Sequence, residues 1–132
     1  MATYAHWLLR IAVASVFLFH GYGKVMDVGA FAGMMGFSVT VAWLVTLAEL
    51  GGGVLILVGG VMKDGDGPLG GSLATRAGAA MMAIVALGAI VLAHWPQWSF
   101  VPSESHPMGG MEFQVTLLLI SLYFLIVGNS KN

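Results

Sequence analysis

Several ionisable side chains lie within or at the ends of long apolar runs, where a charge is costly, and five of them could do chemistry together. They are His20, Lys24, Glu49, His94 and Glu112. A charged group at the centre of a membrane helix costs roughly 2.5–3.5 kcal/mol, so such groups indicate functional sites by default. An imidazole and a carboxylate can exchange protons, and an ammonium stabilises developing negative charge. Imidazoles and carboxylates together can also ligate a transition metal. These residue types therefore point to proton transfer or metal binding inside a membrane.

Glu49 is the strongest of these candidates because it is the single charge in the run from Val39 to Met62. A membrane helix needs about 20 apolar residues, and this run is long enough. With about 3.6 residues per turn, one helix face combines the carboxylate with small residues. That face consists of Glu49, Gly52, Gly53, Ile56 and Gly60. A face with so few side chains lets another helix approach closely. We therefore predict that Glu49 points into a tightly packed bundle.

The composition is typical of a membrane protein. Of the 132 residues, 58% are hydrophobic and 8% are charged, and the mean hydropathy is +0.91. Soluble domains contain about 45–50% apolar and about 25% charged residues. The net charge of −1 and the lack of a basic run exclude an electrostatic nucleic-acid-binding surface. Because the sequence has no cysteine, disulfides, thiolate metal sites and cysteine-ligated cofactors are also excluded.

Four apolar runs predict an all-α integral membrane protein, with a four-transmembrane-helix bundle in a single domain over residues 1–132. The expected spans are residues 7–23, 39–62, 74–95 and 111–128. Residues 24–38 are too short and too rich in glycine to span. We expect a short interfacial helix there after the first span, with Asp27 as its cap.

The distribution of lysine and arginine predicts the orientation of the bundle, because these residues accumulate on the cytoplasmic side. With four spans, one side carries Arg10, Lys63, Arg76 and Lys131, and the other carries Lys24. Both termini are therefore expected in the cytoplasm. Arg10 and Arg76 lie close to span ends, where a long side chain can extend its charged group to water.

Helical rise places the ionisable groups at similar depths. At about 1.5 Å per residue, His20 lies about 20 Å above the inner start of its span, and Glu49 about 12–15 Å below the outer start of the next. In a core about 30 Å thick, the two groups meet at nearly the same height. Lys24 lies one turn above His20, and His94 and Glu112 come at outer span ends. These positions predict a polar pocket in the outer half of the bundle, with Glu49 at its floor.

The same residues also allow structural interpretations. Glu49 can form an ion pair with His20 or Lys24 that locks the bundle. His94 can be an ordinary hydrogen-bonded residue at a helix end, and Glu112 can lie in interfacial water. The spacing of the residues leaves these alternatives open.

Several short motifs resemble the DoxX/DoxD family of small bacterial membrane proteins. They are His20-Gly21-Tyr22-Gly23-Lys24, Glu49-x-x-Gly52-Gly53 with Gly59, His94, and Gly110-Met111-Glu112. The resemblance implies a four-helix protein of the bacterial inner membrane that is associated with redox enzymes and electron transport. The DoxD branch is similar to the membrane subunit of thiosulfate:quinone oxidoreductase, and other members are accessory subunits of membrane oxidoreductase complexes.

The first functional hypothesis is therefore a subunit of a redox complex that handles quinone and its protons. In this hypothesis Glu49, His20 and Lys24 are catalytic. His20 hydrogen-bonds a quinone carbonyl, Glu49 relays protons and Lys24 stabilises negative charge. His94 and Glu112 join His20 and Glu49 as cofactor-binding residues. The redox centre must then belong to a partner protein.

Two alternatives remain beside it. His20, Glu49, His94 and Glu112 form a two-His, two-carboxylate set suited to Zn, Mn, Fe or Cu(II). The chain can also be a non-catalytic structural or assembly subunit of a larger membrane complex, with the polar cluster setting the register of the helices. The expected partners are the lipid bilayer, other subunits of a redox complex or further copies of the chain, and no nucleic acid. Whether the chain itself is an enzyme stays open.

Overall fold

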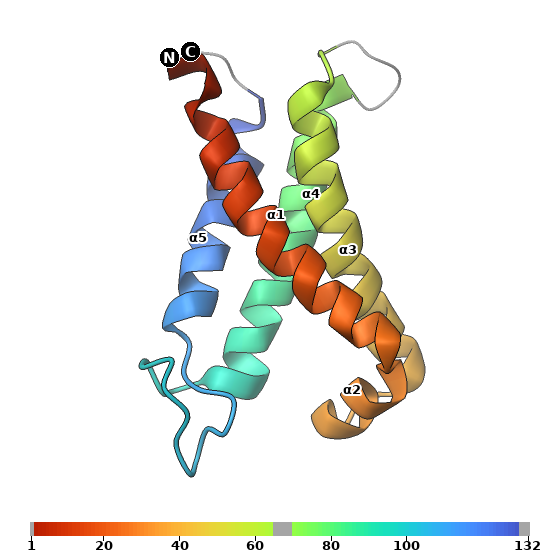
Figure 1. The fold of residues 1–132 in the computed structure, drawn as a ribbon, viewed down its shortest axis with the longest axis vertical. Coiled ribbons are helices and arrows are strands. Elements are labelled where there is room, and N and C mark those ends of the chain that lie inside the picture. The colour runs from red at the N-terminus through yellow and green to blue at the C-terminus, as the bar shows by residue number, and fades with distance from the viewer. Residues whose placement is uncertain (1, 65–69, 130–132) are drawn as a thin grey trace.

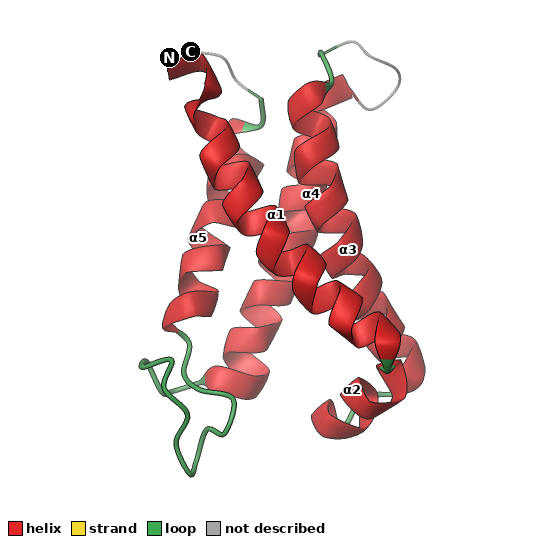
Figure 2. Cartoon of the chain, in the orientation of Figure 1, coloured by secondary structure: helices red, strands yellow, loops and turns green. Residues whose placement is uncertain are grey.

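The computed structural model describes residues 2–64 and 70–129, in which all regular structure is helical and no β-strand occurs (Figure 2). In chain order the elements are α1 (Ala2–Met26), α2 (Val28–Met35), α3 (Val39–Val61), α4 (Gly70–Ala89), the π-helical turn η1 (Ile90–His94) and α5 (Glu112–Val127). The predicted all-α fold class is confirmed.

Within the described ranges 2–64 and 70–129, three helical segments are long and apolar enough to cross a membrane: Tyr4–Met26, Val39–Val61 and Gly70–His94. They correspond to the first three predicted spans; the first and third begin earlier in the chain than expected, and the second and third end one residue earlier. The fourth apolar helix, Glu112–Val127, matches the predicted span 111–128 but has only 16 residues. The membrane character of the chain follows from the three long helices, whereas a fourth crossing stays a prediction.

The helix ends gather into two groups (Figure 1). The start of α1, the end of α3, the start of α4 and the end of α5 lie together at what we call the terminal end. The helix α2 and the loop of residues 95–111 lie at the opposite end, called here the α2 end. Arg10 and Arg76 therefore lie towards one end and Lys24 towards the other, as the charge distribution predicts. Lys131 lies outside the described residues, and the direction of insertion stays a prediction.

The short helix predicted after the first span is present as α2. The Asp27 side chain accepts a hydrogen bond from the Ala30 N–H at 2.8 Å and so caps the helix start. The helix ends at Gly36, whose φ of 67° suits a residue without a Cβ. The Phe31 ring of α2 faces back to α1, where it lies 4.8 Å from Lys24 Nζ. The predicted cap is thus confirmed, and α2 packs mainly against the start of α3, where Val28 and Ala32 are buried with Ala42.

Small residues bring α3 and α4 into close contact, as the predicted face requires. A Cβ on Gly59 would lie 2.6 Å from the backbone nitrogen of Thr75, and one on Gly78 would lie 2.8 Å from the Gly52 carbonyl oxygen. Distances this short leave no room for a methyl group. The predicted face is buried at Glu49, Gly52, Gly53 and Ile56, with Gly59 buried and Gly60 half-buried further along.

Arg10 is buried, with 1% of its surface exposed, and it does not extend to water as expected. Its Nη1 donates hydrogen bonds to the Ile56 carbonyl at 2.6 Å and to Thr75 Oγ1 at 2.9 Å, and its Nη2 donates to Asn129 Oδ1 at 2.6 Å. The expectation was wrong because α1 begins at Ala2. Arg10 is then in the third turn of the helix, not in the first. One guanidinium therefore joins α1 to α3, to α4 and to the segment after α5.

We predict that Gly59→Ala destabilises the protein by about 1–3 kcal/mol, because the new methyl group forces α3 away from α4. Gly51→Ala is the matched control on the same helix, since its Cβ would meet only Met81 Sδ at an ordinary 3.6 Å. Thermal unfolding in detergent measures both variants. Equal stability of the two variants would contradict the close packing at Gly59.

We also predict that Arg10→Lys lowers stability by about 2–4 kcal/mol, because an ammonium keeps the charge but cannot reproduce the planar fork of hydrogen bonds. Arg76→Lys serves as the control, since Arg76 is exposed. The same unfolding measurement applies. An Arg10→Lys variant as stable as Arg76→Lys would show that the guanidinium network contributes little.

Candidate functional site

A cavity of about 1190 Å³ opens between the helices at the α2 end. Its wall comes from the second half of α1, from α2, from the first half of α3, from the end of α4 with η1, and from the start of α5. Most of the lining is apolar, but several polar side chains also reach it, among them His20, Lys24, Glu49, His94 and Gln114. Four of the five predicted candidates thus line one cavity.

Lys24 and Glu49 form an ion pair in the wall of this cavity. Lys24 Nζ lies 2.7 Å from both Glu49 Oε1 and Glu49 Oε2, and the side chains are 19% and 7% exposed. Gly21, one turn before Lys24, permits this geometry because a Cβ there would lie 2.8 Å from Leu50 and 3.2 Å from Glu49 Cβ. The glycine lets α3 approach α1 at the depth of the carboxylate. The structure therefore contains the Glu–Lys alternative that the sequence left open.

His20 lines the same cavity but does not pair with Glu49. Its ring is exposed and makes an edge contact with Phe19, with centroids 5.8 Å apart. Of the two candidates on α1, Lys24 reaches the carboxylate because its side chain is longer and its ammonium neutralises the negative charge. His20 is thus left facing the cavity as a free imidazole within the described part of the chain.

His94 is buried at the end of η1 and uses both ring nitrogens. Its Nδ1 lies 2.8 Å from the Gly109 carbonyl oxygen, so Nδ1 must carry the proton and donate it. Nε2 is then an acceptor, and Gln114 Nε2 donates to it at 3.0 Å. The other amide atom, Gln114 Oε1, is buried and has no partner among the described residues. Sequence reasoning missed Gln114, although a single amide in the apolar run 111–128 was a signal.

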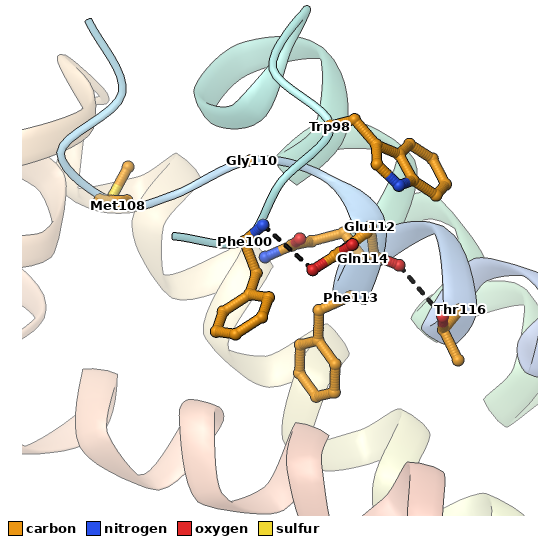
Figure 3. Close-up of a pocket in the computed structure, with 8 residues that line it drawn as sticks. All are labelled: Trp98, Phe100, Met108, Gly110, Glu112, Phe113, Gln114 and Thr116. Atoms are coloured by element: carbon orange, nitrogen blue, oxygen red, sulfur yellow. Dashed lines mark hydrogen bonds between the residues drawn. The ribbon is translucent and has the colours of Figure 1, made fainter. Parts of the chain in front are cut away.

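Glu112 does not line the large cavity but an adjoining hollow of about 620 Å³, which shares Met108, Phe113 and Gln114 with that cavity (Figure 3). Its Oε1 accepts a hydrogen bond from the Phe100 N–H at 3.2 Å. The loop of residues 95–111 also packs tightly at Gly110. A Cβ on this glycine would clash with the Ser99 and Gln97 carbonyl oxygens. The Gly110-Met111-Glu112 motif therefore folds the loop of residues 95–111 onto the start of α5 and holds the Gly109 carbonyl against His94.

The four-residue metal set expected as an alternative is not assembled. The described residues contain no group of three or more histidine, aspartate and glutamate side chains that could hold a metal ion. The physical reasons are local: Lys24 occupies both Glu49 oxygens, His94 uses both nitrogens, and Glu112 belongs to the other hollow.

Comparison with known proteins supports the family resemblance. A protein-family model described as DoxX matches residues 5–63, which include Gly21, Lys24 and Glu49. The chain is also similar to "Putative oxidoreductase CatD" from Bacillus subtilis (strain 168), with 29% identity over 125 residues that cover 92% of this chain and 78% of that protein. No solved structure matches the chain. The resemblance to DoxX predicted from the sequence is thus confirmed for the segment that forms the ion pair.

We predict that Lys24→Met destabilises the protein by about 3 kcal/mol, because it leaves the Glu49 carboxylate buried without its counter-charge. Adding Glu49→Gln should recover most of this loss, since the double variant buries no unpaired charge. Thermal unfolding of both single variants and the double variant gives the coupling between them. Strictly additive losses would contradict a direct ion pair.

Proposed function

Because residues 5–63 of this chain match the DoxX family, we propose that it is an integral membrane subunit of an oxidoreductase complex whose cavity binds a quinone. The observation that carries this proposal is the Lys24–Glu49 pair in the wall of a large apolar cavity. The name of the Bacillus subtilis relative, "Putative oxidoreductase CatD", supports the redox context.

The dimensions and lining of the cavity suit a quinone ring with a hydrocarbon tail. Ligand sites usually occupy about 300–1,000 Å³ and combine apolar walls with a few placed polar groups. This cavity has about 1190 Å³, with side chains such as Phe31, Met34, Leu44 and Ile84 in its wall. A tail can lie along these apolar side chains while the ring oxygens reach the polar residues.

A bound quinone supplies the capacity to take up two electrons and two protons. Lys24 donates a hydrogen bond towards a carbonyl oxygen placed beside it, and its charge stabilises negative charge that develops there. Glu49 holds the ammonium in place and can take or return a proton. His20, exposed on the same wall, is the second group able to move a proton. The chain has no cysteine to ligate a redox centre, so the electrons come from a partner subunit.

The proposed function also implies how many times the chain crosses the membrane and which side its termini face. We assign the whole chain to one DoxX-like domain in the bacterial inner membrane, with four crossings and both termini in the cytoplasm. The 16 residues of α5 span about 24 Å, and a short apolar helix of this kind is accommodated by local thinning of the bilayer. The cavity and Lys24 then lie in the outer half of the membrane.

A structural or assembly subunit is the second candidate. The bidentate geometry of the Lys24–Glu49 ion pair favours it. Both Glu49 oxygens accept from the same ammonium, which is the geometry of a pair that locks α1 to α3. In that case the cavity holds lipid, and the pair sets only the register of the helices.

Glu49→Gln separates the two candidates. For the quinone-handling subunit, we expect quinone-dependent turnover of the co-purified complex to fall at least about tenfold, with assembly unchanged, because the proton-carrying group is lost. Glu104→Gln is the control, since Glu104 is exposed in the loop of residues 95–111. Loss of the complex in mild detergent would instead support the assembly role, and normal turnover would remove Glu49 from the mechanism.

A further inference from the structure

The cavity has a second polar wall that the Lys24–Glu49 pair does not explain. His94 and Gln114 line the same cavity, from η1 and α5. Gln114 Oε1 is the unusual atom, because it is buried and lacks a hydrogen-bond donor among the described residues. Most buried polar atoms in proteins have a partner, and one without a partner costs free energy in the absence of a ligand.

The orientation of the Gln114 amide is determined by its neighbours. The Gly109 carbonyl requires a proton on His94 Nδ1, and in the neutral imidazole this leaves Nε2 able only to accept. Gln114 must therefore turn its NH₂ group to His94 and its oxygen away from it. Reversing the amide would place oxygen against an unprotonated nitrogen. The atom without a partner is thus the amide oxygen Oε1, which can form a hydrogen bond only with a donor.

We propose that Gln114 Oε1 accepts a hydrogen bond from a hydroxyl group of the ligand, so that the cavity distinguishes the hydroquinone form from the quinone form at this wall. The inference rests on the proposed quinone-binding function and deepens it. A hydroquinone carries an O–H donor where the quinone has only a carbonyl acceptor. The carbonyl oxygen of a quinone cannot form a hydrogen bond with Gln114 Oε1, because both atoms are acceptors.

The two polar walls then have complementary roles. Lys24 supplies a charged donor and suits a ligand oxygen that accepts, whereas Gln114 supplies an acceptor and suits an O–H. Gln114 already lines the cavity, so a small movement of its side chain that keeps the bond to His94 exposes the oxygen to a ligand there. His94 acts as a positioning residue, because its bond to the amide nitrogen decides which end of the amide is free.

The test compares two probes, a short-tailed ubiquinone and its hydroquinone, by equilibrium binding to the full chain under anaerobic conditions. Gln114→Met keeps the length of the side chain and removes the amide. We expect it to weaken hydroquinone binding about 3- to 10-fold, the effect of one neutral hydrogen bond, and to change quinone binding less than about twofold. Thr116→Val is the matched control, because Thr116 is on α5, bonds to the Glu112 carbonyl and does not line this cavity.

The other outcomes are also decisive. Equal weakening of both probes, or no change in either, overturns the role of Gln114 while the proposed function stands. If neither probe binds the unaltered chain, the proposed function fails and this inference fails with it. Where Gln114→Met does not fold, Gln114→Asn withdraws the oxygen by one methylene and must show the same selective loss.

Discussion

The architecture depends on a buried guanidinium that has to be satisfied within the bundle. Arg10 directs its hydrogen bonds to a backbone carbonyl of α3, a hydroxyl of α4 and an amide after α5. The ring of Phe124 on α5 lies 4.6 Å from its central carbon. A charge buried at this depth is tolerated only when such partners surround it. The requirement therefore holds α1, α3, α4 and α5 together at the terminal end, while the glycine contacts hold α3 against α4.

The other end of the molecule is built differently, and this difference produces the cavity. There α1 approaches α3 through Gly21 and the Lys24–Glu49 pair, and α2 folds back over Lys24. Between these helices and η1 and α5 lies the large cavity, which is lined mostly by apolar side chains. The α2 end therefore encloses a mostly apolar cavity with a few polar side chains in its wall.

The loop of residues 95–111 connects Glu112 to the polar wall formed by His94 and Gln114. Hydrogen bonds from the Gly110 N–H to the Ser99 carbonyl and from the Met111 N–H to the Gln97 carbonyl close this loop on itself. The closure presents the Gly109 carbonyl to His94, which sets the tautomer of the imidazole and, through it, the orientation of Gln114. Glu112 accepts a hydrogen bond from the Phe100 N–H and so supports this loop, although its side chain does not line the cavity.

The sequence alone determined the features that depend on neighbours along the chain: the apolar runs, the cap at Asp27, the buried face around Glu49 and the family resemblance. Helical period, capping and hydropathy are local properties, so they can be counted from residue types. The tertiary structure decided which groups meet. Lys24 rather than His20 pairs with Glu49, Arg10 is enclosed rather than exposed, and Gln114 joins His94 while Glu112 does not. These outcomes depend on helix crossing, rotation and side-chain reach, which differ by only a few ångströms between alternatives and are not encoded in spacing.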